Sequence, residues 1–490
     1  MLTYTGHPLV DVGIATICAF AEKPDPTLLT QLDLDAISEY MSKNYVVNPL
    51  KSFLTVAFPN SGFTQPAFEK QPEKRDIYAQ KVLQAYKYSC LGSSETCVFT
   101  GKPAAALSFD VNGNLPPGRV FRQHIPLLTG EGCINFHPYG DAGIPISGEA
   151  LLAIQALPLG CAKVNGRLLA VHSNDPNTIY HFARRFLSWN RKVVHTSRLA
   201  GEKKLPELPK RALTLIIDLL LQIQEEQQML DEDNRPISLT AYHLSNSGQG
   251  VDLNIYHLPL EITEFLKVAM TPRYLSQWNA LRSRGWEIVQ SKNSKKTQKA
   301  DGIQEPRYNV LYEDLFRLPV DAALFIRRYF LRKPERRFRQ GDPRATYSVR
   351  DDTHLISWDL TELFIRKVVH MNESRIQHLR QIGDILAEYI SSENDRRFFH
   401  TFLTARRYDD LRAALIRVSV GRLKRGQSPL ITFEPYIEAF EQGEDLPYSD
   451  WRLARDLVLI RMIERLYQLG WIQANKDELP EPEIVEELSV

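Results

Sequence analysis

The chain has 490 residues, of which 43% are hydrophobic and 24% are charged. This length exceeds the size of one ordinary core, so about two to four domains are expected. The formal net charge of +1 excludes a protein that is basic or acidic throughout, but it leaves room for local basic faces that are offset by acidic ones.

Helical and irregular segments alternate in the first part of the chain. Amphipathic periodicity predicts helices over residues 32–44 and 70–88. Residues 90–160 have many glycines and prolines and few long apolar runs. This composition is typical of a loop-rich insertion on a small β framework.

Two β-hairpins and two further helices are predicted next. Residues 162–171 hold two apolar runs around an Asn-Gly pair, which is the strongest short signal for a hairpin. Residues 175–190 begin with Asp-Pro, an N-cap followed by proline at the first helical position, so a helix is expected there. The pattern also predicts a helix over 211–231 and a second hairpin over 240–257.

The sequence from residue 315 onward is almost wholly helical in its periodicity. Glycine, proline and paired aspartates interrupt this pattern over residues 341–352, where we expect a domain boundary. Residues 355–475 then predict a bundle of about four or five helices, followed by an acidic tail.

Cysteine usage suggests a zinc ribbon that has lost its ligands. Five cysteines form an odd, sparse set, which favours reduced thiols over a disulfide framework. A ribbon usually takes its four zinc ligands from two Cys-x-x-Cys pairs. Only Cys97 remains here, because Thr100, Ser147 and Ala150 stand at the other three positions. We therefore expect no bound metal, and a ribbon-like loop held by packing around Cys97 and residues 151–159. Another conceivable zinc set, without this spacing, is Cys90, Cys97, Cys133 and His137.

These segments together predict an α+β fold. We expect a mixed N-terminal domain over residues 1–350, with small β-hairpins and a degenerate zinc-ribbon-like insertion at 90–160, and a C-terminal helical bundle over 351–490. The chain has neither a run of about eighteen apolar residues nor an N-terminal secretory signal, so a cytoplasmic protein without membrane contact is expected.

Arginine is concentrated in residues 321–350 and 396–425, and aromatic residues are interleaved in the first of these segments. Guanidinium groups bind phosphate and aromatic rings stack on bases, so both segments are candidates for nucleic-acid binding, together with a lysine-rich loop at 291–300. The alternative is a solvated helix face with local salt bridges. The candidate backbone contacts are Arg327, Arg328, Arg332, Lys333, Arg336, Arg337, Arg339, Lys292, Lys295, Lys296, Arg406, Arg407, Arg412, Arg417, Arg422 and Arg425.

Signatures of catalysis are nearly absent. The chain has no phosphate-binding loop, no His-Glu-x-x-His and no Gly-x-Ser-x-Gly. His7 and Asp11 could share one face of a helical turn as metal ligands, but such a pair near an N-terminus is more often a cap and its hydrogen-bond partner. We expect a protein that is not an enzyme and that needs no cofactor.

Short motifs in a fixed order resemble those of one family. Residues 4–13 read YTGHPLVDVG, which is similar to the TG-x-P-x-x-D-x-G start of the CRISPR-associated CXXC-CXXC proteins. The agreement continues in order at Cys97-x-x-Thr100-Gly101, 125–130 (IPLLTG), Asn135-Phe136, 152–160 (LAIQALPLG), 245–249 (SNSGQ) and 255–259 (IYHLP). The chain departs from the family pattern at three of the four cysteine positions.

The resemblance implies a large subunit of a type I-B CRISPR Cascade complex. Such a subunit lies near the 5′ end of the crRNA, beside the handle-binding subunit and the Cascade backbone subunits. It recognises the protospacer-adjacent motif (PAM) on target double-stranded DNA, supports R-loop formation, and recruits an effector, either a nuclease-helicase or a transposition adaptor. The C-terminal bundle resembles the small subunit of such complexes, so we hypothesise an internal start at Met371 that yields small-subunit copies.

The side chains that read the PAM are expected in residues 110–145, because base edges are read by polar side chains on a loop that can enter a groove. The candidates are Asn112, Asn114, Arg119, Arg122, Gln123 and, foremost, Asn135. Asn135 could instead satisfy backbone groups in a tight turn. Two other functions stay open, namely a stand-alone nucleic-acid-binding protein with a degenerate zinc ribbon and a metal-dependent hydrolase.

Overall fold

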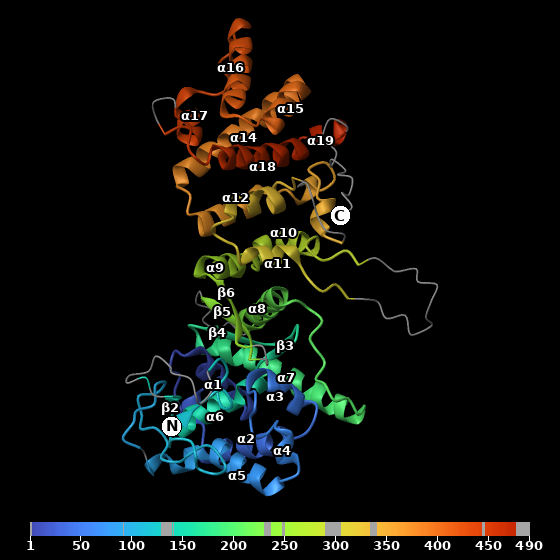
Figure 1. Ribbon diagram of the computed structural model, residues 1–490. Helices are drawn as coiled ribbons and strands as arrows, with labels where there is room; N and C mark the ends of the chain where they lie inside the picture. Colours follow the sequence, from blue (N-terminus) through green and yellow to red (C-terminus); the bar gives the residue numbers. More distant parts are fainter. Residues whose placement is uncertain are drawn as a thin grey trace. The chain divides into compact units, whose positions relative to one another are not determined.

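The computed structural model in Figure 1 describes residues 2–91, 93–128, 140, 142–229, 237–246, 250–289, 305–333, 341–442 and 446–476. The chain divides into two compact units, Met1–Leu260 and Glu261–Val490. The α+β class is confirmed, with 58% of the described residues helical and 8% in strands of small antiparallel sheets. The domain boundary expected after residue 350 falls inside the second unit.

The core of the first unit is built around α1 and α6, which pack against each other and are buried on almost every side. The helices expected over 32–44, 175–190 and 211–231 are confirmed as α2, α7 and α8, although α7 is longer than expected. The segment 70–88 is only partly α-helical, because α5 is followed by a 3₁₀ helix, Ala85–Leu91. The α-helices are α1 (Pro8–Phe20), α2 (Gln31–Asn44), α3 (Leu50–Ala57), α4 (Pro66–Glu69), α5 (Pro72–Leu83), α6 (Gly148–Ala156), α7 (Pro176–Leu199) and α8 (Ala212–Met229).

The residues of the N-terminal motif have structural roles. Gly6 has a φ of +84°, a left-handed conformation that glycine adopts without strain. Pro8 is the first residue of α1, where its missing N–H would have no helical partner. The buried carboxylate of Asp11 accepts hydrogen bonds from the backbone N–H groups of Thr5 (2.7 Å) and Gly6 (2.9 Å). This carboxylate therefore holds the N-terminal loop against the helix.

Gly13 lies where α1 and α6 approach each other most closely. A Cβ atom at this position would lie 2.0 Å from the carbonyl oxygen of Ala153 in α6. We expect Gly13→Ala to push the two helices apart and to lower the free energy of unfolding of the first unit by about 1–3 kcal/mol. Denaturant unfolding followed by circular dichroism measures this loss.

The matched control is Gly421→Ala in α16, where a Cβ would meet no atom within 4 Å. This variant should be neutral or slightly stabilising, because alanine is the better helix former. Equal losses in the two variants would contradict the packing role of Gly13.

Both predicted hairpins are confirmed in one four-stranded antiparallel sheet of the first unit, with the order β3-β4-β5-β6. The turn of the first hairpin consists of Asn165 and Gly166, whose φ angles of 49° and 74° suit a tight type I′ turn. The strands are β3 (Ala162–Val164), β4 (Arg167–Ser173), β5 (Leu239–Ser245) and β6 (Asp252–Leu258). A separate small sheet pairs β1 (Arg119–Val120) with β2 (Ile144–Pro145).

The two segments with degenerate zinc-ligand positions lie side by side. Cys97 is buried in a tight turn, and the hydroxyl groups of Thr100 and Ser147 lie 3.4 Å apart. Ser147 is also the N-cap of α6. The expected end of the insertion is therefore wrong, because residues 148–160 form α6 and the 3₁₀ helix Leu157–Gly160 in the core. Their apolar side chains are buried on all faces, so they lack the amphipathic pattern that would have marked a helix.

The second unit contains helices and no strand among its described residues. Residues 355–475 are helical as expected, but their described part holds seven α-helices where about four or five were predicted. A π-helical turn, Ile326–Phe330, follows α12, and another, Ile365–Val369, follows α13. The α-helices are α9 (Leu260–Ala269), α10 (Pro272–Ser283), α11 (Val310–Leu315), α12 (Ala322–Phe325), α13 (Trp358–Phe364), α14 (Glu373–Glu393), α15 (Arg396–Thr404), α16 (Tyr408–Lys424), α17 (Phe433–Phe440), α18 (Trp451–Gln468) and α19 (Trp471–Ala474). Within the described ranges, none of the helices in either unit has the length and apolar character needed to cross a membrane.

Candidate nucleic-acid interface

Segments that are distant in sequence meet at the buried carboxylate of Asp456 in α18. Arg327, from the π-helical turn after α12, donates from Nε to Oδ2 over 2.8 Å. Arg455 donates from Nε and Nη2 to Oδ1 over 3.1 and 2.6 Å. The Nη1 atom of Arg455 also donates to the carbonyl oxygen of Ala405, just after α15. The carboxylate of Asp456 thus fixes two guanidinium groups next to the short connection between α15 and α16.

Lys333 and Arg406 add positive charge beside this pair. Burial lowers the pKa of Lys333 from its usual value, and three neighbouring cations lower it further, whereas the charge of Asp456 acts in the opposite direction. Those cations are Arg455, Arg327 and Arg406. Neither Lys333 nor Arg406 forms an ion pair with any residue that the structure describes. We call Arg327, Lys333, Arg406 and Arg455 the Lys333 cluster.

The Lys333 cluster has more positive than negative charge, because Arg327 and Arg455 share the carboxylate of Asp456 while Lys333 and Arg406 add two further cations. A bound anion would reduce the repulsion that now lowers the pKa of Lys333. Phosphate groups are suited to this role, since guanidinium and ammonium groups form strong charge-assisted hydrogen bonds with them. Arg455 is itself buried, so Arg327, Lys333 and Arg406 are the members of the cluster that could reach a phosphate. These three join both of the arginine-rich segments found in the sequence into one candidate phosphate-binding surface.

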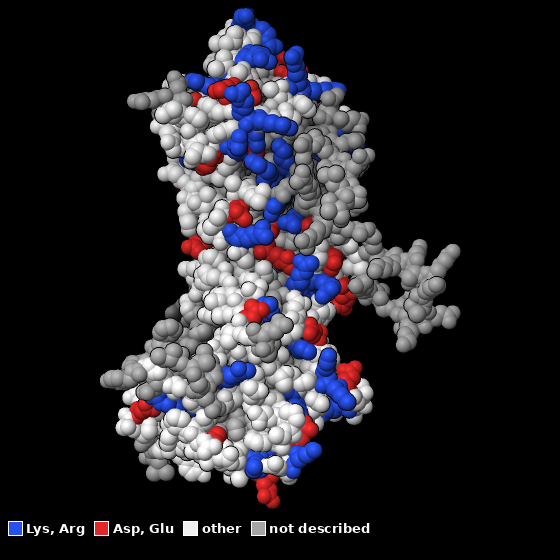
Figure 2. Space-filling view, viewed as in Figure 1, with Lys and Arg blue, Asp and Glu red and all other residues white. Residues whose placement is uncertain are grey.

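Further cations lie on α15 and α16, close in sequence to Arg406. On the face shown in Figure 2, lysine and arginine side chains gather over the part of the second unit that contains α14–α18. Four cations of α15, α16 and the residues between them are exposed and form no ion pair within the described ranges, namely Arg397, Arg407, Arg417 and Lys424. They extend the basic surface along the two helices.

Three predicted contacts on α16 and just after it have partners within the chain. Arg412 lies 3.6 Å from the carboxylate of Glu441, and Arg425 lies 3.0 Å from that of Glu393. Arg422 donates to the carbonyl oxygen of Ser428 over 3.0 Å. These arginines would have to exchange partners to bind phosphate.

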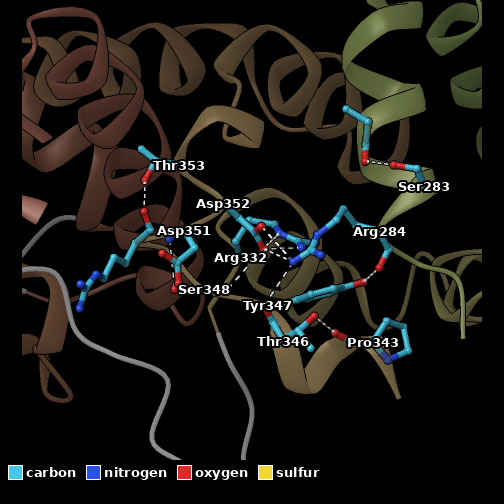
Figure 3. A network of polar contacts seen from close by, with 12 residues as sticks. Ser283, Arg284, Arg332, Pro343, Thr346, Tyr347, Ser348, Asp351, Asp352 and Thr353 are labelled. Carbon is cyan, nitrogen blue, oxygen red and sulfur yellow. Dashed lines mark hydrogen bonds and ion pairs between the residues drawn. The ribbon is translucent and has the colours of Figure 1, made fainter. Parts of the chain in front are cut away.

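Arg332 is a correction to the predicted interface, because it lies in the interior and not on the surface. Its Nε and Nη2 atoms donate to Oδ2 of Asp352 over 2.9 and 2.5 Å, and its guanidinium carbon lies 3.4 Å from the ring centroid of Tyr347 (Figure 3). Arg284 donates to the other carboxylate oxygen of Asp352 over 3.1 Å. Arg328 is likewise engaged, with Asp314 at 2.8 Å. Arg332 therefore stabilises the fold and cannot contact a phosphate backbone.

The predicted PAM contacts differ in their accessibility. Asn112 and Asn114 are exposed, in a loop that the carboxylate of Asp110 closes by accepting the backbone N–H of Asn114 over 3.1 Å. Arg122 and Gln123 are half-buried. Among the described candidates, only the two asparagines present exposed side-chain amides.

Arg119 is a second correction, because its side chain is buried and engaged within the chain. Its guanidinium group forms an ion pair with Glu95 and donates to the carbonyl oxygen of Ala142 over 3.1 Å. It is therefore not available to a base edge. Seven other predicted contacts lie outside the described residues, namely Asn135, Lys292, Lys295, Lys296, Arg336, Arg337 and Arg339.

The side chains of His7 and Asp11 share no hydrogen bond or ion pair in the part of the chain that the structure describes. The carboxylate of Asp11 accepts the backbone hydrogen bonds of the N-terminal loop and lies 3.2 Å from Nε2 of His172. The ring of His7 instead packs edge-on against Phe99, with 4.7 Å between the centroids, and burial lowers its pKa. A search over the described ranges finds no group of three or more His, Cys, Asp or Glu side chains that could hold a metal ion.

Sequence reasoning missed Arg455. It lies outside both arginine-rich segments and directly precedes Asp456, so it adds nothing to a local excess of positive charge. The available signal was their position at the start of a long apolar helical stretch in α18, because buried charges in such a stretch are usually tied to distant partners.

Comparisons with protein-family models, with curated proteins and with solved structures find no match to this chain.

Proposed function

We propose that the chain binds nucleic acid through the Lys333 cluster, as the large subunit of a type I-B CRISPR Cascade complex. The observation that carries this proposal is the convergence of Lys333 and Arg406 beside the carboxylate-bound Arg455. The order of the short motifs from residue 4 to residue 259 supports the assignment to this type of subunit.

The Lys333 cluster is expected to bind phosphates without reading bases. Two of its cations, Arg327 and Arg455, are held by the carboxylate of Asp456 and by a backbone carbonyl group. The cluster thus offers positive charge and not a pattern of donors and acceptors that matches a base edge. PAM recognition is assigned to the exposed loop of Asn112 and Asn114, because an asparagine amide can pair with the edge of a base.

The partners that we propose follow from this assignment. They are the crRNA, target double-stranded DNA, the Cascade backbone and handle-binding subunits, and an effector that is either a nuclease-helicase or a transposition adaptor. Met371 directly precedes Asn372, the N-cap of α14. An internal start there would produce a small subunit that contains α14–α19.

The test is to purify the tagged chain after co-expression with the genes that neighbour its own and with a CRISPR array. We expect it to co-purify with crRNA and with repeated backbone subunits, and the complex should bind a duplex that carries both the matching target and a PAM. Mass spectrometry of the same sample shows whether a product beginning at Met371 is present.

A stand-alone nucleic-acid-binding protein is the second candidate, because the Lys333 cluster needs no other subunit to bind phosphate. If the chain purifies without RNA and binds unrelated duplexes as tightly as the matched target, this second function replaces the first.

A further inference from the structure

An apolar groove of about 470 Å³ lies between α16 and α17 in the second unit. Nine of the ten residues that line it come from a single stretch of chain, 412–433. They are Arg412, Leu415, Ile416, Ser419, Val420, Pro429, Ile431, Thr432, Phe433 and, from α17, Tyr436. The groove is therefore a local feature of α16, the connection after it and the start of α17.

The rim of the groove is unusually exposed for such apolar side chains. Ile416 is 53% exposed, Val420 is 42% exposed and Phe433 is 73% exposed, and Leu423, one turn beyond Val420 on α16, is 55% exposed. Ile416, Val420 and Leu423 follow one another at intervals of four and three residues, so they form one stripe along α16. The opposite side of α16 is already buried through Leu411 and its neighbours. This helix thus has a second apolar face that nothing described covers.

One end of the groove is fixed by a network of polar contacts. The hydroxyl group of Tyr408 donates to Glu441 over 2.5 Å and lies 2.7 Å from that of Tyr436. Arg412, which lines the groove, lies 3.6 Å from the same carboxylate. These contacts join the start of α16 to α17, so the two walls are held together before any ligand binds.

The stretch of chain that supplies nine of the lining residues is basic, although two of its arginines, Arg412 and Arg425, already face Glu441 and Glu393. Residues 411–433 include five cations and no aspartate or glutamate. The cations are Arg412, Arg417, Arg422, Lys424 and Arg425. An occupant that is both apolar and acidic would complement this surface, whereas a nucleic acid would leave the exposed stripe of Ile416, Val420 and Leu423 without apolar contact.

We infer that this groove binds an amphipathic helix of a protein partner, with apolar side chains at intervals of three or four residues and carboxylates along its flanks. The apolar anchors would fill the space between Ile416 and Phe433, as in other complexes in which a helix lies in a groove. The flanking carboxylates would face the cations of α16. This inference does not depend on the role of the Lys333 cluster.

The test uses the full chain and labelled peptides of about eighteen residues, the length of roughly five helical turns. The first peptide has leucines at helical intervals and glutamates and alanines elsewhere. A second peptide has lysine in place of every glutamate, and a third has the same composition as the first in scrambled order. Fluorescence anisotropy should show that the acidic amphipathic peptide binds at least about tenfold more tightly than the two others.

The double variant Ile416→Gln/Phe433→Gln should weaken this binding by about tenfold or more, because apolar anchors dominate such interfaces. The matched control is Val320→Gln, which changes a 92% exposed apolar side chain outside the groove. Neither variant changes the net charge, so nucleic-acid binding by the Lys333 cluster should stay as in the wild type.

Four outcomes would overturn the inference. Equal binding of the acidic and the lysine peptides would show that the cations of α16 do not select the partner. Unchanged binding by the double variant would show that the peptide does not bind in the groove. Sedimentation that shows a dimer of the wild-type chain, lost in the double variant, would make a second copy of this chain the occupant. Competition between duplex DNA and the peptide for the groove would make nucleic acid the occupant instead.

Discussion

Asp352→Ala is expected to lower the free energy of unfolding of the second unit by about 3–5 kcal/mol, because it leaves a buried guanidinium group without a counter-charge. Arg332 is fully buried, and its charge is balanced by Asp352 alone among the described residues. The ring of Tyr347 lies against the guanidinium group, but it cannot replace a carboxylate. Five of the six tryptophans belong to the second unit, so urea unfolding followed by tryptophan fluorescence measures the loss.

Asp351→Ala is the matched control for this prediction. Asp351 is the preceding residue, but its side chain is 58% exposed and forms only a surface ion pair of 3.4 Å with Lys476. We expect a loss of no more than about 1 kcal/mol from it. The double variant Arg332→Met/Asp352→Leu should recover much of the stability, because an apolar pair of similar volume avoids burying charge. Similar losses for Asp351→Ala and Asp352→Ala would contradict the structural role assigned to this network.

Local signals in the sequence were sufficient for part of the fold. Asp175-Pro176 predicts the start of α7, and Asn165-Gly166 predicts the turn between β3 and β4, because a cap or a tight turn depends on a few adjacent residues. The helices α1 and α6 gave no such signal. Their faces are apolar all round because both lie in the core, and periodicity cannot distinguish such a helix from any other short apolar run.

The sequence was sufficient to predict which segments are rich in basic residues, but not which of these residues lie together at the surface. Counting basic residues identified Arg327, Lys333 and Arg406, yet the same count included Arg332. Arg332 is buried because it pairs with Asp352, whereas none of the other three residues has such a partner within residues 341–352. Asp352 belongs to this segment, which the sequence suggested as a domain boundary. Burial and the pairing of charges depend on contacts between distant residues, so they appear only once the chain is folded.

Lys333→Gln/Arg406→Glu is expected to weaken binding of a nucleic-acid duplex by about a hundredfold at roughly 0.1 M salt, because two charge-assisted phosphate contacts are lost. Both side chains lack an acidic partner within the described ranges, so the double variant removes no ion pair that holds the fold together. The slope of log K against log salt concentration should fall by about two, since each lost phosphate contact releases about one counterion fewer.

Anisotropy titrations over a range of salt concentrations measure both quantities. The loss should be the same for duplexes with and without the PAM, because the Lys333 cluster contacts phosphates and not bases. Arg273→Glu is the control, since Arg273 is an exposed arginine of α10 whose side chain is 69% accessible. If Arg273→Glu weakens binding as much as the double variant does, the effect comes from the overall charge of the chain, and the Lys333 cluster is not the phosphate-binding surface.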